Sequence, residues 1–172
     1  VRKVTEDEDV LIAALLHDVR EDVEPMGGLL SQKEIQWFEL SDNVKWKYDD
    51  SAIFALFGQR VADMVNQLTD KFSKENYPTF NRKSRKQFER ERYATLSPEA
   101  KLIKLADIAE NLSDGDDTDR GFMVMYIKEK ALCIPYLRPE PSARTVLYKA
   151  HQTLFLTTLD TLEKQKKKFA IR

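Results

Sequence analysis

Apolar residues recur every three or four positions along most of this chain, the spacing of an α-helix with one buried face. The clearest case covers residues 98 to 113, where Ser97 and Pro98 supply a helix start. The acidic loop of residues 114 to 119 is expected to cap the helix that follows it. Strand signals are weak, so the pattern predicts an all-α fold. The expected helices cover residues 7 to 20, 31 to 40, 50 to 57, 58 to 69, 82 to 95, 98 to 113, 120 to 134 and 142 to 168.

Length and composition favour one compact domain. A chain of 172 residues can bury one core, and 42% hydrophobic with 33% charged residues is ordinary for a soluble helical protein. We therefore expect a single domain over residues 1 to 172. A single cysteine, Cys133, excludes a disulfide framework. No apolar run is long enough to cross a membrane and no secretory signal is visible, so a cytoplasmic location is expected.

Positive charge is concentrated in one stretch, although the formal net charge is only −1. Between Lys71 and Arg92, eight lysines and arginines stand against three glutamates. This asymmetry favours an anionic ligand. A near-neutral chain is a poor candidate for nucleic acid, so a small nucleotide that carries several phosphates is the expected partner. The oligomeric state is left open.

A cluster of possible metal ligands follows an apolar run near the start of the chain. In a helix, residues four apart share a face, so His17 lies beside Glu21 and Asp18 beside Asp22. An imidazole nitrogen with carboxylate oxygens is a donor set suited to Mn²⁺, Fe²⁺ or Zn²⁺. Such a pair also occurs where a helix simply ends in solvent. The cluster alone is therefore weak support for a metal site.

A second candidate group lies in the helix that follows Ser97. Asp107 falls within the apolar sector of that helix, where a carboxylate is expensive to bury unless it is paired or bound to a cation. Asn111 lies one turn later on the same face, and Lys104 nearly one turn earlier. Asp107 thus either caps a neighbouring backbone or completes a metal site with the His-Asp pair.

These motifs together resemble the HD-superfamily hydrolases of the RelA/SpoT type. The resemblance covers residues 10 to 113 and includes a helix that ends in Leu-Thr-Asp at Asp70. The basic segment of residues 81 to 86, with Arg92, is similar to the helix that precedes Lys-Leu-Ala-Asp in small alarmone hydrolases. The motifs that carry the resemblance are His17-Asp18, Glu21-Asp22, Leu68-Thr69-Asp70, Lys104-Leu105-Ala106-Asp107 and Asn111.

The resemblance implies an HD-domain helical bundle that hydrolyses guanosine 3′,5′-bis(diphosphate) to release its 3′-pyrophosphate. His17, Asp18 and Asp107 would hold one Mn²⁺, with another divalent metal as an alternative. Glu21 and Asp22 would orient and deprotonate the attacking water. The implied substrate contacts are Lys104, Asn111, Arg82, Arg85 and Lys86.

One departure from the family pattern concerns histidine. Members of the family hold the metal with two His and two Asp, and the first His lies well before the His-Asp pair. Because the sequence begins at Val1, we expect the N-terminal helix with that His to be missing from it. The other histidine here, His151, is expected to pack in the C-terminal helix and to be a poor replacement. Residues 23 to 50 are expected to form an aromatic-rich insertion.

Two other functions remain open at this point. A different HD nucleotide phosphohydrolase, of the 5′-nucleotidase or NADPH phosphatase type, would share the same three metal ligands. A non-catalytic HD-fold module that only binds a nucleotide is the second alternative, because the first His is absent from the sequence.

Overall fold

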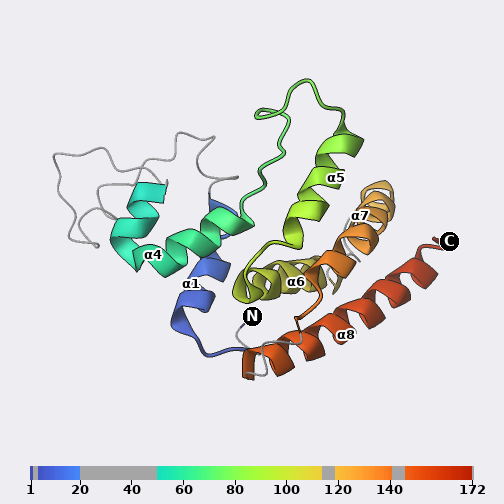
Figure 1. Cartoon of the computed structure of the whole chain (residues 1–172). Helices are drawn as coiled ribbons and strands as arrows, with labels where there is room; N and C mark the ends of the chain where they lie inside the picture. Colours follow the sequence, from blue (N-terminus) through green and yellow to red (C-terminus); the bar gives the residue numbers. More distant parts are fainter. Residues whose placement is uncertain (2–3, 20–49, 114–118, 141–145, 172) are drawn as a thin grey trace. The chain divides into compact units, whose positions relative to one another are not determined.

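The computed structural model describes residues 1, 4–19, 50–113, 119–140 and 146–171, and this part of the chain is helical and contains no strand (Figure 1). The expected all-α fold is therefore confirmed. The elements are α1 (Glu8–Leu16), α4 (Asp50–Leu68), α5 (Arg82–Tyr93), α6 (Pro98–Ser113), α7 (Arg120–Cys133), the 3₁₀ helix η2 (Ile134–Leu137) and α8 (Val146–Lys168).

Most helix positions expected from the sequence are confirmed. α6 covers the expected residues, and the Ser97 hydroxyl accepts the Ala100 N–H at 3.2 Å. Asp119 caps α7 by accepting the Phe122 N–H of its first turn at 2.8 Å. The helix expected over residues 31 to 40 and the insertion expected over 23 to 50 concern residues outside the described part.

Several helices end earlier than expected, among them α4 at Leu68 instead of residue 69 and α5 at Tyr93 instead of residue 95. α1 was expected to reach residue 20 but ends at Leu16, because the His17 imidazole bonds the Ala14 carbonyl at 2.8 Å and so satisfies a C=O at the helix end. α7 ends at Cys133 and tightens into η2. Pro135 there has no N–H with which to continue an α-helix.

The described part of the chain divides into two compact units. The α1–α4 unit comprises Glu6–Asp70, and the α5–α8 unit comprises Val1–Thr5 with Lys71–Arg172. The single domain expected from the sequence stays a prediction. No helix in the described ranges is long and apolar enough to span a membrane.

An arginine clamp joins the two helices of the α1–α4 unit. Arg60 of α4 donates to both carboxylate oxygens of Asp7, at 2.7 and 2.8 Å, and to Asp9 at 2.9 Å. Asp7 also caps α1. Arg60 lowers the pKa of Asp7, so the clamp stays charged at neutral pH. The buried apolar residues of the two helices include Val10, Ala13, Ile53, Val61 and Val65.

α4 is broken at Gly58, as the two expected helices over 50–57 and 58–69 imply. The glycine has φ 82° and ψ 172°, a conformation that is rare for residues with a side chain. A Cβ at this position would meet nothing within 4 Å. The requirement for glycine therefore comes from the backbone alone.

α6 forms the centre of the α5–α8 unit and packs most extensively on α8 (Figure 1). Its apolar residues Leu102, Ile103, Leu105, Ile108 and Leu112 are fully buried. Two lysines of the same helix, at positions 101 and 104, are buried as well. Because a buried charge requires a partner, each of these two lysines must be paired with another group.

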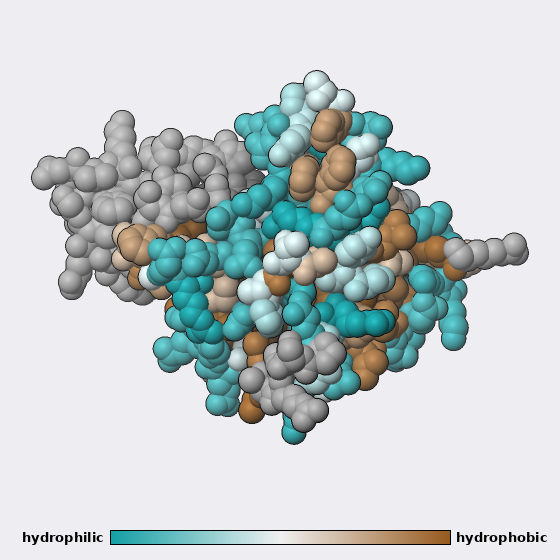
Figure 2. Space-filling model, in the orientation of Figure 1, coloured by the Kyte–Doolittle hydropathy of each residue, from teal (hydrophilic) through white to brown (hydrophobic). Residues whose placement is uncertain are grey.

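Four aromatic rings attach the segment before α5 to that helix. Phe72 lies 4.9 Å from Tyr77 and 5.4 Å from Phe88, and Phe80 lies 5.5 Å from both Tyr77 and Phe88, measured between ring centroids. Three of these rings are partly exposed. On the face drawn in Figure 2, such hydrophobic side chains lie among mostly hydrophilic ones.

His151 is buried inside the α5–α8 unit, as expected for a packing residue. The residue is 2% exposed, and its Nε2 lies 2.9 Å from the Leu137 carbonyl, to which an Nε2–H donates. Burial lowers the pKa of His151 below its usual 6.5, and the charge of Lys101 lowers it further. The folded chain therefore holds this imidazole neutral where an unfolded chain would protonate it.

This shift predicts acid sensitivity. As the pH falls below 6.5, the unfolded chain takes up a proton at His151 before the folded chain does, so stability is lost by up to about 1.4 kcal/mol per pH unit. In His151→Gln, the amide keeps a donor for Leu137 but cannot titrate. Urea unfolding at pH 7.5 and 5.5 should show a smaller loss in the variant. An equal loss in both proteins would contradict the assignment.

Candidate metal and nucleotide site

His17 and Asp18 lie together in the turn that follows α1. The His17 Nε2 is 2.9 Å from the Asp18 Oδ2, and the His17 Nδ1 is 2.8 Å from the Ala14 carbonyl oxygen. The imidazole is partly buried and the carboxylate is half-exposed. The turn therefore brings an imidazole nitrogen and a carboxylate oxygen together.

The contact distances fit a shared cation. With Nδ1 directed at the Ala14 carbonyl, Nε2 is the ring nitrogen that would bind a metal, and a backbone carbonyl behind the ring is the usual support for a histidine ligand. Two ligand atoms that each lie about 2.1 Å from one metal, at right angles, are about 3.0 Å apart. The observed Nε2–Oδ2 separation of 2.9 Å is close to this value.

Glu21 and Asp22 lie outside the described residues. The sequence placed them one helical turn beyond His17 and Asp18, but α1 ends at Leu16 and both candidate ligands stand in a turn. The shared helical face expected for His17 with Glu21 and for Asp18 with Asp22 stays a prediction. The roles of Glu21 and Asp22 stay predictions.

Asp107 is held by side chains one turn away on each side of it in α6. Its Oδ1 accepts the Asn111 amide at 2.7 Å, and its Oδ2 lies 3.5 Å from the Lys104 Nζ. The side chains of Asp107 and Lys104 are only 17% and 10% exposed. The shared face of Lys104, Asp107 and Asn111 expected from the sequence is thus confirmed.

The three proposed metal ligands come from both units. His17 and Asp18 belong to the α1–α4 unit, and Asp107 belongs to the α5–α8 unit. Among the residues that the structure describes, no three His, Cys, Asp or Glu side chains gather as a ready metal site. The structure therefore describes the two parts of the candidate site separately.

Two residues of α7, Tyr126 and Lys130, face the Asp107 group and were missed in the sequence. The Tyr126 hydroxyl is buried without a well-formed hydrogen bond among the described residues. Its pKa is raised by burial and by the charge of Asp107, so the hydroxyl stays protonated, with the Asn111 amide close by. The Lys130 Nζ lies 5.0 Å over the Tyr126 ring. In the sequence, the four-residue spacing of Tyr126 and Lys130 places them on one helix face. The same spacing also occurs on a solvent-exposed face, so it did not mark them as site residues.

The basic residues of α5 are largely engaged within their own unit. Arg82 donates to Glu129 of α7 at 2.7 Å, and the Arg85 guanidinium donates to the Phe80 carbonyl. Lys86 is partly buried and lines a small pocket between α5 and α7. Their expected role in phosphate binding stays a prediction, and for Arg82 it would require exchange of a carboxylate partner for a phosphate.

Glu89 and Arg92 form the buried ion pair of α5. Glu89 accepts the backbone N–H groups of Lys71 and Phe72, each at 3.0 Å, and the Arg92 Nε–H at 2.7 Å. Arg92 therefore has a structural partner here. Of the basic residues noted in the sequence, it is the one most clearly committed to the fold.

Residues 2–112 match the HD domain family, and this range contains His17, Asp18, Asp107 and Asn111. The chain therefore belongs to the HD domain family.

Among curated proteins, the chain is similar to the guanosine-3′,5′-bis(diphosphate) 3′-pyrophosphohydrolase MESH1 of Drosophila melanogaster. The two are 36% identical over 108 residues, which are 63% of this chain and 44% of the relative. The match thus spans less than half the length of that relative. No solved structure matches the chain.

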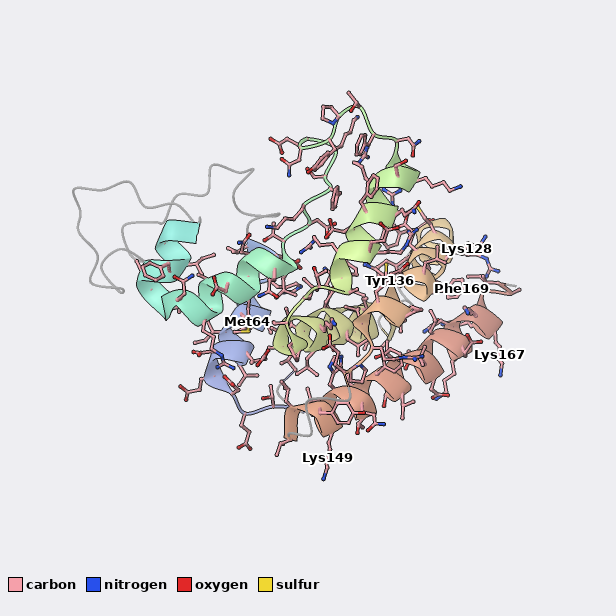
Figure 3. All side chains as sticks on the ribbon, in the orientation of Figure 1. Met64, Lys128, Tyr136, Lys149, Lys167 and Phe169 are labelled. Atoms are coloured by element: carbon pink, nitrogen blue, oxygen red, sulfur yellow. The ribbon has the colours of Figure 1, made fainter. Side chains whose placement is uncertain are left out.

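The buried Tyr126 hydroxyl leads to a prediction about stability. Removing a buried polar group that lacks a good partner should stabilise the chain, so Tyr126→Phe is expected to gain about 1 kcal/mol. Tyr136→Phe is the matched control, because Tyr136 is partly exposed in η2 (Figure 3). Urea unfolding measures both. A loss of stability in Tyr126→Phe would show that the hydroxyl has a strong partner.

Proposed function

We propose that this chain is a metal-dependent nucleotide phosphohydrolase that releases pyrophosphate from the 3′ position of guanosine 3′,5′-bis(diphosphate). The observation that carries this proposal is the His17–Asp18 pair, whose contact of 2.9 Å suits two ligands of one cation. The pair lies inside the range that matches the HD domain family. The printed activity of the Drosophila relative supports the choice of substrate.

The metal in this proposal is held by His17, Asp18 and Asp107, and we propose that it is Mn²⁺. One nitrogen and two carboxylate oxygens form a mixed donor set that suits Mn²⁺ and also accepts Fe²⁺ or Zn²⁺. A bound cation supplies Lewis-acid polarisation of a phosphoryl oxygen and a lowered pKa of bound water. A carboxylate as protected from solvent as that of Asp107 is favoured as a ligand, because Lys104 at 3.5 Å offsets only part of its buried charge.

The chain's own groups move the protons. We propose that Glu21 and Asp22 orient the attacking water and that one of them takes its proton. Two neighbouring carboxylates suit this task, because repulsion between them raises the pKa of one toward neutrality. This assignment comes from the sequence.

Asn111 is proposed to bind the nucleoside. Its amide donates to Asp107 at 2.7 Å and retains a carbonyl oxygen as an acceptor. Lys104 is proposed to neutralise a phosphate, while Arg82, Arg85 and Lys86 of α5 would contact the outer phosphates.

Loss of one ligand tests the metal assignment. Asp107→Asn in the full-length protein should lower bound Mn²⁺ and reduce turnover by about 10²-fold or more, since metal activation of water is lost. Asp160→Asn is the control, because Asp160 is an exposed acid of α8 paired with Lys164. Elemental analysis and pyrophosphate release report the two quantities. Unchanged metal content in Asp107→Asn would exclude it as a ligand.

Substrate choice is the second test of the proposal. With Mn²⁺, the full-length protein should release pyrophosphate from guanosine tetraphosphate and leave deoxynucleoside 5′-monophosphates largely intact. Asn111→Ala should raise KM more than it lowers kcat, because a nucleoside contact far from the reacting phosphorus contributes mainly uniform binding.

The alternatives predict other outcomes of the same assays. Hydrolysis of 5′-monophosphates or NADPH, with the tetraphosphate untouched, would place the chain elsewhere among HD phosphohydrolases. Nucleotide binding without turnover would favour a non-catalytic module. The cytoplasmic location expected from the sequence stays a prediction.

A further inference from the structure

The helix α7 and the 3₁₀ helix η2 that continues it carry apolar side chains on two sides. A helix at the surface of a unit is expected to be apolar on the side that packs and polar on the side that faces solvent. α7 departs from this rule, because large apolar side chains are also exposed on its outer side. Its packed side is formed by the buried residues Met123, Ile127, Cys133, Ile134 and Leu137.

Four large apolar residues lie on the exposed side of these two helices. Phe122 is 49% exposed, Met125 42%, Leu132 56% and Tyr136 37%. Together with Glu129 they follow one another at intervals of three and four residues, so all five share one helix face and form the α7 row. A single exposed apolar residue is ordinary, but a contiguous group of them is typical of an interaction surface.

The intervals of the α7 row match the seam between two packed helices. In such a seam, apolar residues alternate at three and four positions and insert between the side chains of the facing helix. The row extends from Phe122 to Tyr136, which is about 21 Å at 1.5 Å per residue. The occupant that suits this spacing is therefore another helix of similar length.

The α7 row has the same order of side-chain types when it is read from either end. An aromatic residue stands at each end, Met125 and Leu132 come next inward, and Glu129 is in the middle. A second α7 that lies antiparallel on the row would place Met125 against Leu132 of the second copy, and each aromatic end against the other. Because every such contact occurs twice, the arrangement closes with two copies.

The charges at the middle of the row complement each other in the same arrangement. Lys128 is exposed next to Glu129, and an antiparallel second copy brings each Lys128 within reach of the opposite Glu129. The bonds from Arg82 to Glu129, at 2.7 and 3.2 Å, both use Oε1, so Oε2 can accept this second cation. The carboxylate would then lie between Arg82 of its own chain and Lys128 of the second copy.

We propose that the α7 row is a dimer interface, on which a second copy of this chain packs its own α7 in antiparallel orientation. None of the five residues of the row, nor Lys128, is assigned to the metal, the water or the nucleotide, so the interface is independent of the proposed hydrolysis. A seam of about four helical turns is short. The dimer is therefore a reversible one that forms in the micromolar range.

Sedimentation equilibrium of the full chain, from about 1 to 200 µM, tests the interface. We expect a monomer–dimer equilibrium that Leu132→Lys weakens about tenfold or more, since each dimer would then bury two unpaired charges. Leu156→Lys is the matched control, because Leu156 of α8 is 59% exposed and lies outside the row. Circular dichroism checks that each variant stays helical. A chain that stays monomeric throughout, or equal weakening by both variants, would overturn the proposal and leave the row to a different protein.

A charge reversal tests the pairing at the middle of the row. Lys128→Glu places two acids opposite each other and should weaken the dimer about fivefold or more, whereas Lys128→Arg should leave it within a few-fold. Lys149→Glu is the control, because Lys149 is exposed on α8 (Figure 3). Equal dimerisation of Lys128→Glu and Lys149→Glu would overturn the antiparallel alignment.

Cysteine cross-linking tests the orientation of the two copies. Under mild oxidation, a mixture of Met125→Cys and Leu132→Cys proteins should give a disulfide-linked dimer, because the antiparallel alignment places these two positions opposite each other. Two copies of Met125→Cys alone should link much less, since their positions lie about 10 Å apart along the seam, beyond the reach of a disulfide. The unmodified chain is the blank, because Cys133 is buried. Equal or stronger cross-linking of either variant alone would overturn the proposal.

Discussion

The α5–α8 unit depends on the burial of a helix that carries charge. α6 lies at the centre of this unit, yet it contains Lys101, Lys104 and Asp107. A charge can stay there only where a partner offsets its desolvation. Lys101 meets Glu140 at 2.6 Å, and Lys104 lies 3.5 Å from Asp107. Packing of the apolar residues of α6 thus requires these pairs, and the pairs hold a carboxylate that is largely protected from water.

The protected carboxylate organises the groups around it. Asn111 is oriented by its bond to Asp107, and the buried hydroxyl of Tyr126 stays protonated partly because of that charge. Lys130 lies over the Tyr126 ring and feels both Lys104 and Asp107. A change of charge at any of these groups would therefore be felt by the others.

In the α1–α4 unit, the two proposed metal ligands His17 and Asp18 lie directly after the end of α1. The clamp of Arg60 on Asp7 and Asp9 holds the start of α1 against α4. At the other end, the His17 imidazole bonds a carbonyl of the last turn, and this contact both ends the helix and orients the ring. Asp18 then lies beside Nε2 at 2.9 Å. The local geometry of the pair thus follows from how α1 terminates.

The sequence by itself determined the helical class, the break at Gly58, the start of α6 at Ser97 and the shared face of Lys104, Asp107 and Asn111. These follow from local rules of periodicity, capping and backbone conformation, which need only neighbouring residues. Tertiary structure decided which cations are committed to partners, such as Arg82 with Glu129, and that Tyr126 and Lys130 face Asp107. Those facts depend on contacts between residues on different helices, such as Arg82 and Glu129, which are 47 positions apart in the sequence. The pattern of residues within one helix does not show how deeply a side chain is buried against another helix. That burial determines the charge state and the partners of these side chains.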